Sequence, residues 1–192
     1  MNEILVWLSG GDLRSDGLAD EVSAAVLQNP ALFDDLYAGL SESDDVIRGR
    51  TADALEKVSR QRPDLIAAHI LELVDLSSSD QVPMVKMHLA MIFGHMALYE
   101  ELIDILQSAL LDLLEAESVF AKSWAIVSLC IIGRIYPQKS DRIVNRISQL
   151  QADSSIAIRS RAGKALNILT NPNVTFPQGW IKSEMINALV EN

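Results

Sequence analysis

Residues 47–58 read IRGRTADALEKV, and three later segments align with them without a gap: VKMHLAMIFGHM at 85–96, AKSWAIVSLCII at 121–132 and IRSRAGKALNIL at 158–169. In every copy an apolar or small residue precedes a base, and the four bases follow one another at intervals of 38, 36 and 37 residues. Small and apolar side chains within a copy recur three, four and seven positions apart, which places them on one stripe of an α-helix. This period indicates an array of similar helical units.

A second helical pattern lies between the copies and is clearest at 102–114, where the apolar stripe is wide enough to contact helices on two sides. Prolines follow three of the four aligned segments, and acidic turns that can cap the next helix precede all four. Each repeat is therefore predicted to be a helix pair. The predicted helices span 13–28, 31–41, 44–61, 63–76, 80–97, 99–115, 117–136, 139–151, 153–170 and 178–190.

The aligned segments resemble the second helix of HEAT repeats, which typically carries Val-Arg-x-x-Ala-Ala-x-Ala-Leu after a turn that contains Asp. The segments at 47–55 and 158–166 match best, whereas those at 85 and 121 have Lys for Arg and bulkier residues for Ala. The resemblance covers residues 31–170. With its opening at 8–17, the chain is similar to small prokaryotic HEAT-repeat proteins of unassigned activity. The resemblance implies an all-α fold, namely a right-handed α-α superhelix of about five helix pairs. The second helices of these pairs would line a concave side.

Length and composition indicate a single domain over residues 1–192, with 49% hydrophobic and 22% charged residues. Repeat stacks need a polar cap at each end. We expect a degenerate N-terminal cap at 1–28, repeats at 31–170 and a C-terminal cap helix within 175–192. Trp180 is expected to act as a lid over the last repeat, the alternative being an exposed contact for a partner.

The net charge of −10 opposes general adhesion to nucleic acid or anionic membrane. All of the excess lies in residues 1–80, which contain 16 acids and 6 bases, whereas residues 81–192 contain 10 of each. Residues 134–164 have a local balance of +5. A linear stack would therefore have an acidic end and a basic end, so the argument against nucleic acid applies firmly to one end only.

Two interpretations of the repeated bases are open. The four bases are Arg48, Lys86, Lys122 and Arg159. The resemblance implies that each bonds the Asp of a turn within or between repeats, which would form an internal ladder. The alternative is a row of anion-binding side chains. Each base has an acid three to six residues upstream, which favours the ladder.

Two positions after each base lie Arg50, His88, Trp124 and Arg161, and one turn further lie Asp53, Met91, Val127 and Lys164. If these rows face a groove, its centre is apolar and aromatic and its ends are charged, which is typical of an anchor pocket with a charged rim. The alternative is that the large apolar members fill gaps between helices. The candidate partner-binding residues are Arg50, His88, Met91, Trp124, Arg161 and Lys164.

The sequence predicts neither catalysis nor a metal or other cofactor. His88 and His95 are separated by two helical turns, about 10.5 Å of rise, which is too far for one ion. His69 could approach either from a neighbouring helix. Cys130 lies in an apolar run without a nearby histidine, so we expect an inert buried thiol. No phosphate loop, Gly-x-Ser-x-Gly element or Cys-x-x-Cys motif is present.

The expected function is that of a non-catalytic interaction module or adaptor that holds a protein or peptide on its concave face. The amino terminus lacks the cationic region of a secretory signal, and no apolar run is long enough to span a bilayer, so a cytoplasmic location without membrane contact is expected. One alternative is a nucleic-acid-binding protein resembling the HEAT-like alkylpurine DNA glycosylases. A second is an enzyme of the phycobilin-lyase type. The partner and the oligomeric state stay open.

Overall fold

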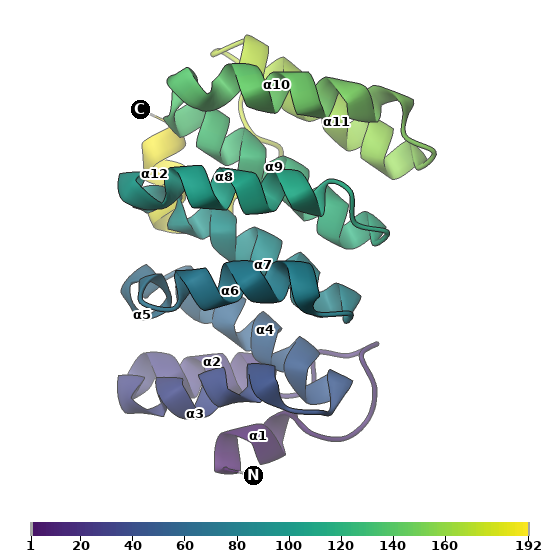
Figure 1. Cartoon of the computed structure of the whole chain (residues 1–192). Coiled ribbons are helices and arrows are strands. Elements are labelled where there is room, and N and C mark those ends of the chain that lie inside the picture. Colours follow the sequence, from purple (N-terminus) through teal and green to yellow (C-terminus); the bar gives the residue numbers. More distant parts are fainter. Residues whose placement is uncertain (1, 192) are drawn as a thin grey trace.

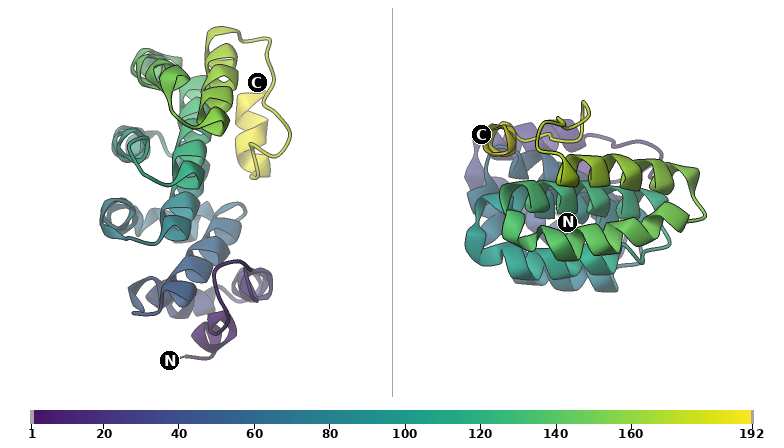
Figure 2. Two further views of the ribbon diagram at one scale, coloured as in Figure 1. Left: turned by 90° about the vertical axis from the view of Figure 1, so that its right-hand side faces the viewer. Right: turned by 90° about the horizontal axis from the view of Figure 1, so that it is seen from above.

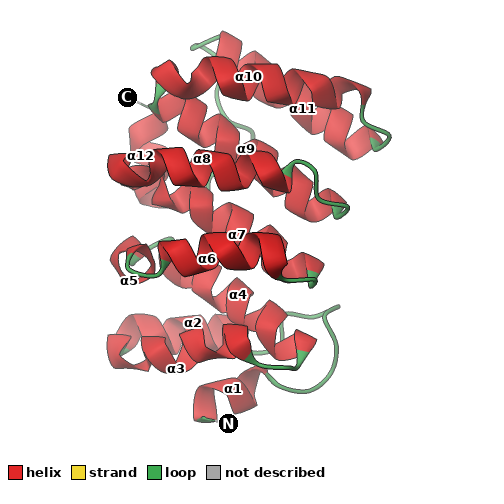
Figure 3. Cartoon of the chain, in the orientation of Figure 1, coloured by secondary structure: helices red, strands yellow, loops and turns green. Residues whose placement is uncertain are grey.

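The computed structural model describes residues 2–191, and within that range it contains α-helices and short 3-10 turns but no strand (Figure 3). The prediction of an all-α fold is therefore confirmed. Four long helices contain the aligned segments, and we call them the inner helices: α4 (Asp45–Ser59), α7 (Pro83–His95), α9 (Val119–Ile135) and α11 (Ile156–Thr170). The remaining helices are α1 (Glu3–Leu8), α2 (Ala19–Gln28), α3 (Phe33–Tyr37), α5 (Pro63–Ala67), α6 (Ile70–Ser79), α8 (Ile103–Leu113), α10 (Ser140–Gln149) and α12 (Glu184–Val190).

The helices are stacked along one direction (Figure 1). Each inner helix contacts the next, from α4 through α7 and α9 to α11. Helices α6, α8 and α10 form an outer column on one side of the inner helices, and α2 and α12 lie on the other side (Figure 2). We call that other side, where α2 contacts α4 and α12 contacts α9, the inner face. One continuous apolar core runs through the stack.

Local sequence signals explain where the inner helices begin. The side chains of Asp44, Ser118 and Ser155 accept hydrogen bonds from the first free amides of α4, α9 and α11. Helix α7 begins instead with Pro83, and the preceding turn is held by Asp80, which accepts from the amide of Val82 at 2.6 Å. The predicted acidic turns are thus confirmed as the starts of these helices.

The inner helices approach one another closely where a repeat has a small residue. Gly94 of α7 lies against Ser128 of α9, so that a Cβ at position 94 would stand 2.5 Å from Ser128 Oγ and 3.3 Å from its Cα. Ser128 Oγ also donates to the carbonyl of Ala90 at 2.6 Å. This contact fixes the spacing of α7 and α9 at one buried point.

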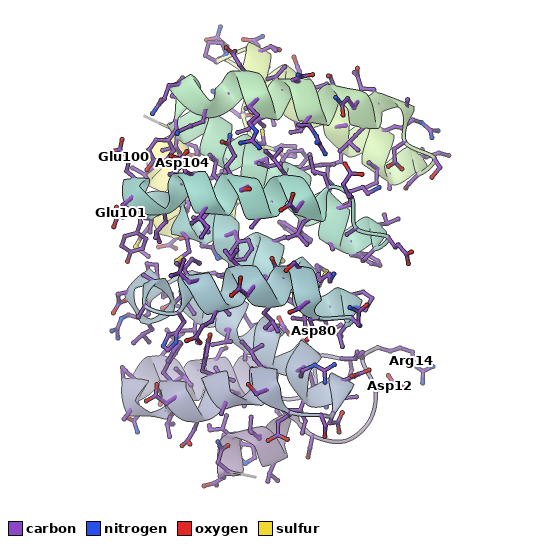
Figure 4. All side chains as sticks on the ribbon, viewed as in Figure 1. Asp12, Arg14, Asp80, Glu100, Glu101 and Asp104 are labelled. Atoms are coloured by element: carbon purple, nitrogen blue, oxygen red, sulfur yellow. The ribbon has the colours of Figure 1, made fainter. Side chains whose placement is uncertain are left out.

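The predicted ladder is confirmed at two of its four positions. Arg48 Nε donates to Asp80 Oδ2 at 3.0 Å, and Lys122 Nζ donates to Asp153 Oδ2 at 2.9 Å; each acid lies in the turn of the following repeat (Figure 4 labels Asp80). Instead, Arg159 bonds main-chain carbonyls of the turn before its own helix, and Lys86 bonds the carbonyl of Ser78 at the end of α6. In the last repeat no further turn follows Arg159, which explains why it bonds locally.

The two ends of the chain differ most from the predicted helices. A helix that was not predicted, α1, precedes an irregular loop at 9–18, so the helix expected from residue 13 begins at Ala19. Gly10, Gly11 and Gly17 of this loop have φ between 58° and 77°, which is strained for residues with a side chain. The predicted helix at 178–190 begins only at Glu184.

The C-terminal segment does not end at the last repeat. Trp180 is 8% exposed and lies against Phe176, so it is a buried side chain and not the exposed partner contact that was the alternative. The chain then continues along the inner face until Ser183 Oγ donates to the carbonyl of Arg60, 123 positions earlier in the sequence. Helix α12 consequently contacts α9, the third of the four inner helices. It does not cover the outer end of α11.

Candidate functional site

The candidate site is the inner face, which is covered near one end by the N-terminal loop and toward the other end by the C-terminal segment (Figure 2). The six predicted partner-binding residues lie on four different inner helices, α4, α7, α9 and α11. The structure places three of them in buried positions, namely Arg50, His88 and Met91. Trp124 and Arg161 are partly buried, and Lys164 is exposed.

Arg50 is fully occupied by the protein itself. Its guanidinium donates to the carbonyls of Leu8, Ser9, Gly10, Asp12 and Ser15 and to Ser15 Oγ, at distances from 2.7 to 3.3 Å. The side chain is therefore used to hold the N-terminal loop on α4. Figure 4 shows Asp12 and Arg14 of this loop at the edge of the stack.

Trp124 and Arg161 contact each other, as expected for neighbours in one row. The Arg161 guanidinium lies 5.8 Å from the centre of the Trp124 ring and 5.4 Å from that of Trp180, and Lys182 Nζ lies 5.1 Å from the Trp124 ring. Burial lowers the pKa of Arg161. Neither cation forms an ion pair within residues 2–191.

Other bases of the 134–164 segment are mostly neutralised. Lys139 pairs with Asp104 and Arg146 with Glu115, both acids of the preceding outer helix or its end. Arg134 bonds the carbonyl of Ile168 in the last turn of α11 and those of Pro172 and Val174 after it. Figure 4 shows Glu100, Glu101 and Asp104 gathered at the start of α8. The excess positive charge that is left at the inner face thus comes from Arg161, Lys164 and Lys182.

An apolar pocket of about 420 Å³ opens near the amino ends of α7 and α9. It is lined by Leu13, Pro83, Met84, Met87 and Phe120. Phe120 is 69% exposed and lies one turn before Trp124, so the pocket and the tryptophan share a side of α9. The sequence analysis did not name Phe120 as a candidate, because it precedes the aligned segment. It did not name Leu13 either, because Leu13 was assigned to a helix.

A group of buried ionisable side chains lies between α4 and α7. Asp53, Glu56 and His88 offer ligand atoms that all lie within 4.8 Å of one another. His88 Nδ1 is 3.7 Å from Asp53 Oδ1, and His95 Nε2 is 3.7 Å from Glu56 Oε1. The sequence prediction weighed the three histidines and did not consider that α4 places Asp53 and Glu56 beside His88.

Burial controls the protonation of this group. It lowers the pKa of His88 to about 4, an effect that Asp53 opposes and that Lys182, Lys57 and Arg60 strengthen. Burial likewise lowers the pKa of His95 to about 3. Both imidazoles are consequently neutral near pH 7. Burial raises the pKa of Glu56, although Arg60 opposes this shift.

The remaining candidates are explained by packing. His69 does not approach His88 or His95 but lies against the rings of Tyr37 and Phe33, at centroid distances of 4.2 and 5.5 Å. Cys130 is fully buried, as predicted, and burial raises its pKa to about 12, which is the environment expected of an inert thiol.

Within residues 2–191, no helix combines the length and apolar character needed to cross a bilayer. Comparison of the chain with protein-family models, with curated proteins and with solved structures gives no match.

Proposed function

We propose that the protein is a non-catalytic interaction module, a short HEAT-like right-handed α-α superhelix that binds a segment of another protein on its inner face. The regular succession of contacting inner helices supports the architecture. The salt bridges from Arg48 to Asp80 and from Lys122 to Asp153, which join consecutive repeats, support it further. A stack of this kind presents an extended surface, which suits a peptide or a helix of a partner.

The observation that carries the proposal is the pocket beside Phe120. Its lining is almost entirely apolar, and two of its five side chains are methionines, which adapt to differently shaped partners. An aromatic side chain exposed at the rim of such a pocket is a typical anchor of protein interfaces. Met91, in contrast, is buried and contributes to the core beneath the face.

Charge defines the chemistry of the partner. Three cations make no ion pair within the described chain: Arg161, Lys164 and Lys182. The ring of Trp124 lies close to Arg161 and to Lys182. We therefore expect the partner to insert a bulky apolar side chain beside Phe120 and to place carboxylates near these three cations. The carboxylates would set orientation and association rate more than total affinity.

A peptide-display selection on the full-length protein tests this proposal. Selected peptides should combine a large apolar residue with Asp or Glu, and the substitution Phe120→Ser should weaken their binding about tenfold or more. The matched control is Leu71→Ser, because Leu71 is 63% exposed on the outer helix α6. Lys164→Glu should lower the association rate and its dependence on salt.

Three outcomes would contradict the proposal. The first is equal binding of the selected peptides to the Phe120 variant and to the native protein. The second is a selection that yields no peptide with acidic residues. The third is binding of duplex DNA that weakens steeply with salt and depends on the same three cations, which would favour the nucleic-acid alternative.

A further inference from the structure

Two histidine nitrogens of α7 face carboxylate oxygens of α4 at distances too long for a hydrogen bond. His88 Nδ1 and Asp53 Oδ1 are 3.7 Å apart, as are His95 Nε2 and Glu56 Oε1. His88 is only 7% exposed, and its Nδ1 has no hydrogen-bond partner among the described residues. A buried polar atom without a partner is costly, so its presence points to a missing ligand.

The protonation of His95 follows from its neighbour Ser59. Ser59 Oγ donates its single proton to the carbonyl of Glu56 at 2.6 Å, so it can only accept from His95 Nδ1 at 2.8 Å. In the neutral ring the other nitrogen, Nε2, then carries a lone pair, and it is this lone pair that faces Glu56. Ser59 thus fixes the tautomer of His95, which lies beside Glu56 at the edge of the group.

The cations already present do not fill the space between these atoms. Lys57 Nζ bonds Asp53 Oδ2 at 3.0 Å and leaves Oδ1 without a hydrogen bond within residues 2–191. Arg60 bonds both oxygens of Glu56 from the side of its own helix. Each carboxylate oxygen has a second lone pair, so Arg60 and a further cation can bind the same carboxylate.

We propose that Asp53, Glu56 and His88 bind a divalent transition-metal ion such as Zn²⁺, with water in the fourth position. An ion about 2.1 Å from both Asp53 Oδ1 and His88 Nδ1 would subtend an angle of about 120° at their 3.7 Å separation, within the range of zinc geometry. The imidazole nitrogen selects against Mg²⁺ and Ca²⁺, which prefer oxygen ligands. The site lies under the inner face, where Lys182 and Ser183 of the C-terminal segment pass over α4.

Lys57 is the built-in competitor for this ion. Its ammonium also lies 2.6 Å from Asp20 Oδ1 and 3.9 Å from Asp16 Oδ2, so it retains partners if it leaves Asp53. Removing it with Lys57→Met should therefore increase the affinity for the metal. A purely structural set of side chains would give no such increase.

The test is a titration of the metal-free, full-length protein with Co²⁺, followed by displacement with Zn²⁺. We expect one ion per chain, ligand-field absorption typical of nitrogen and oxygen ligands, and a rise in melting temperature with Zn²⁺ concentration. His88→Ala and Asp53→Asn should each weaken binding by about tenfold or more. His69→Ala is the matched control, because His69 contacts Phe33 and Tyr37 away from the site, and it should leave binding unchanged.

The conservative Asp53→Asn variant keeps the test decisive if His88→Ala does not fold. The proposal is overturned if the native protein gives neither Co²⁺ absorption nor stabilisation by Zn²⁺ at millimolar ion. It is also overturned if binding persists unchanged in Asp53→Asn, or if it is lost in His69→Ala.

Discussion

Replacing Arg50 by Met should release the N-terminal loop while leaving the helix stack folded. Arg50 is 3% exposed and donates to five carbonyls of residues 8–15. Four of these belong to residues that water can reach after the loop opens, whereas Leu8 is fully buried. The variant loses the charge-assisted hydrogen bond to the buried carbonyl of Leu8 and the weaker bonds to the four carbonyls that water can reach. Together these losses should decrease the free energy of unfolding by about 3 kcal/mol.

For a chain of this size, that decrease lowers the melting temperature by about 6–12 °C. Urea unfolding measures the free energy, and amide hydrogen exchange should show faster exchange over residues 9–18 than in the native protein. The control is Arg14→Met, because the Arg14 side chain is 91% exposed and pairs only with Asp12, so no measurable change is expected.

Gly17 provides an independent check of the same contact. Its φ is 58°, and an added Cβ would stand 2.7 Å from Arg50 Cζ. Gly17→Ala should therefore destabilise the native protein more than it destabilises the Arg50→Met variant, where the clash is relieved. Equal losses in both backgrounds, or a loss below about 1 kcal/mol for Arg50→Met, would refute the role of Arg50 as the anchor of the loop.

Three further predictions concern buried positions. The pKa of His88 is about 4 in the folded protein and near 6.5 in the unfolded chain, so the unfolded chain binds a proton first as the pH falls. The free energy of unfolding should therefore decrease between about pH 6.5 and pH 4. Urea titrations should show a smaller decrease for His88→Gln. Gly94→Ala should lower the free energy of unfolding by about 1–3 kcal/mol by forcing α7 from α9, measured against Gly163→Ala, because a Cβ at Gly163 meets nothing within 4 Å. Cys130 should react with thiol reagents only as fast as the protein unfolds, and rapid labelling of the native protein at pH 8 would contradict its burial.

The helices of the repeats were predictable because each carries its own local signals. Caps such as Asp44 and Ser118, the prolines and the spacing of apolar residues act over a few positions, and they placed the inner helices within three residues of their starts and ends. The loop at 9–18 was not predictable in this way. Its conformation depends on carbonyls that bond Arg50, more than 30 positions later.

The candidate site was likewise predictable only in part. The structure brings Trp124 and Arg161 into contact, and their place in one row of the repeats was anticipated. The position of Arg50 under the loop was not, nor was the group formed by Asp53, Glu56 and His88, because these depend on how α4 is rotated against α7 and on what covers it. A helical period alone does not fix that rotation.

The bond from Ser183 to Arg60 has a consequence for how such a protein can evolve. Arrays whose units contact only their neighbours can gain or lose a unit by duplication or deletion without altering the rest. Here the C-terminal segment must reach back from the last inner helix to the end of the first. Its length therefore fits only the present number of repeats. Inserting a unit would move Arg60 out of its reach, and a duplicated repeat would survive only with a longer tail.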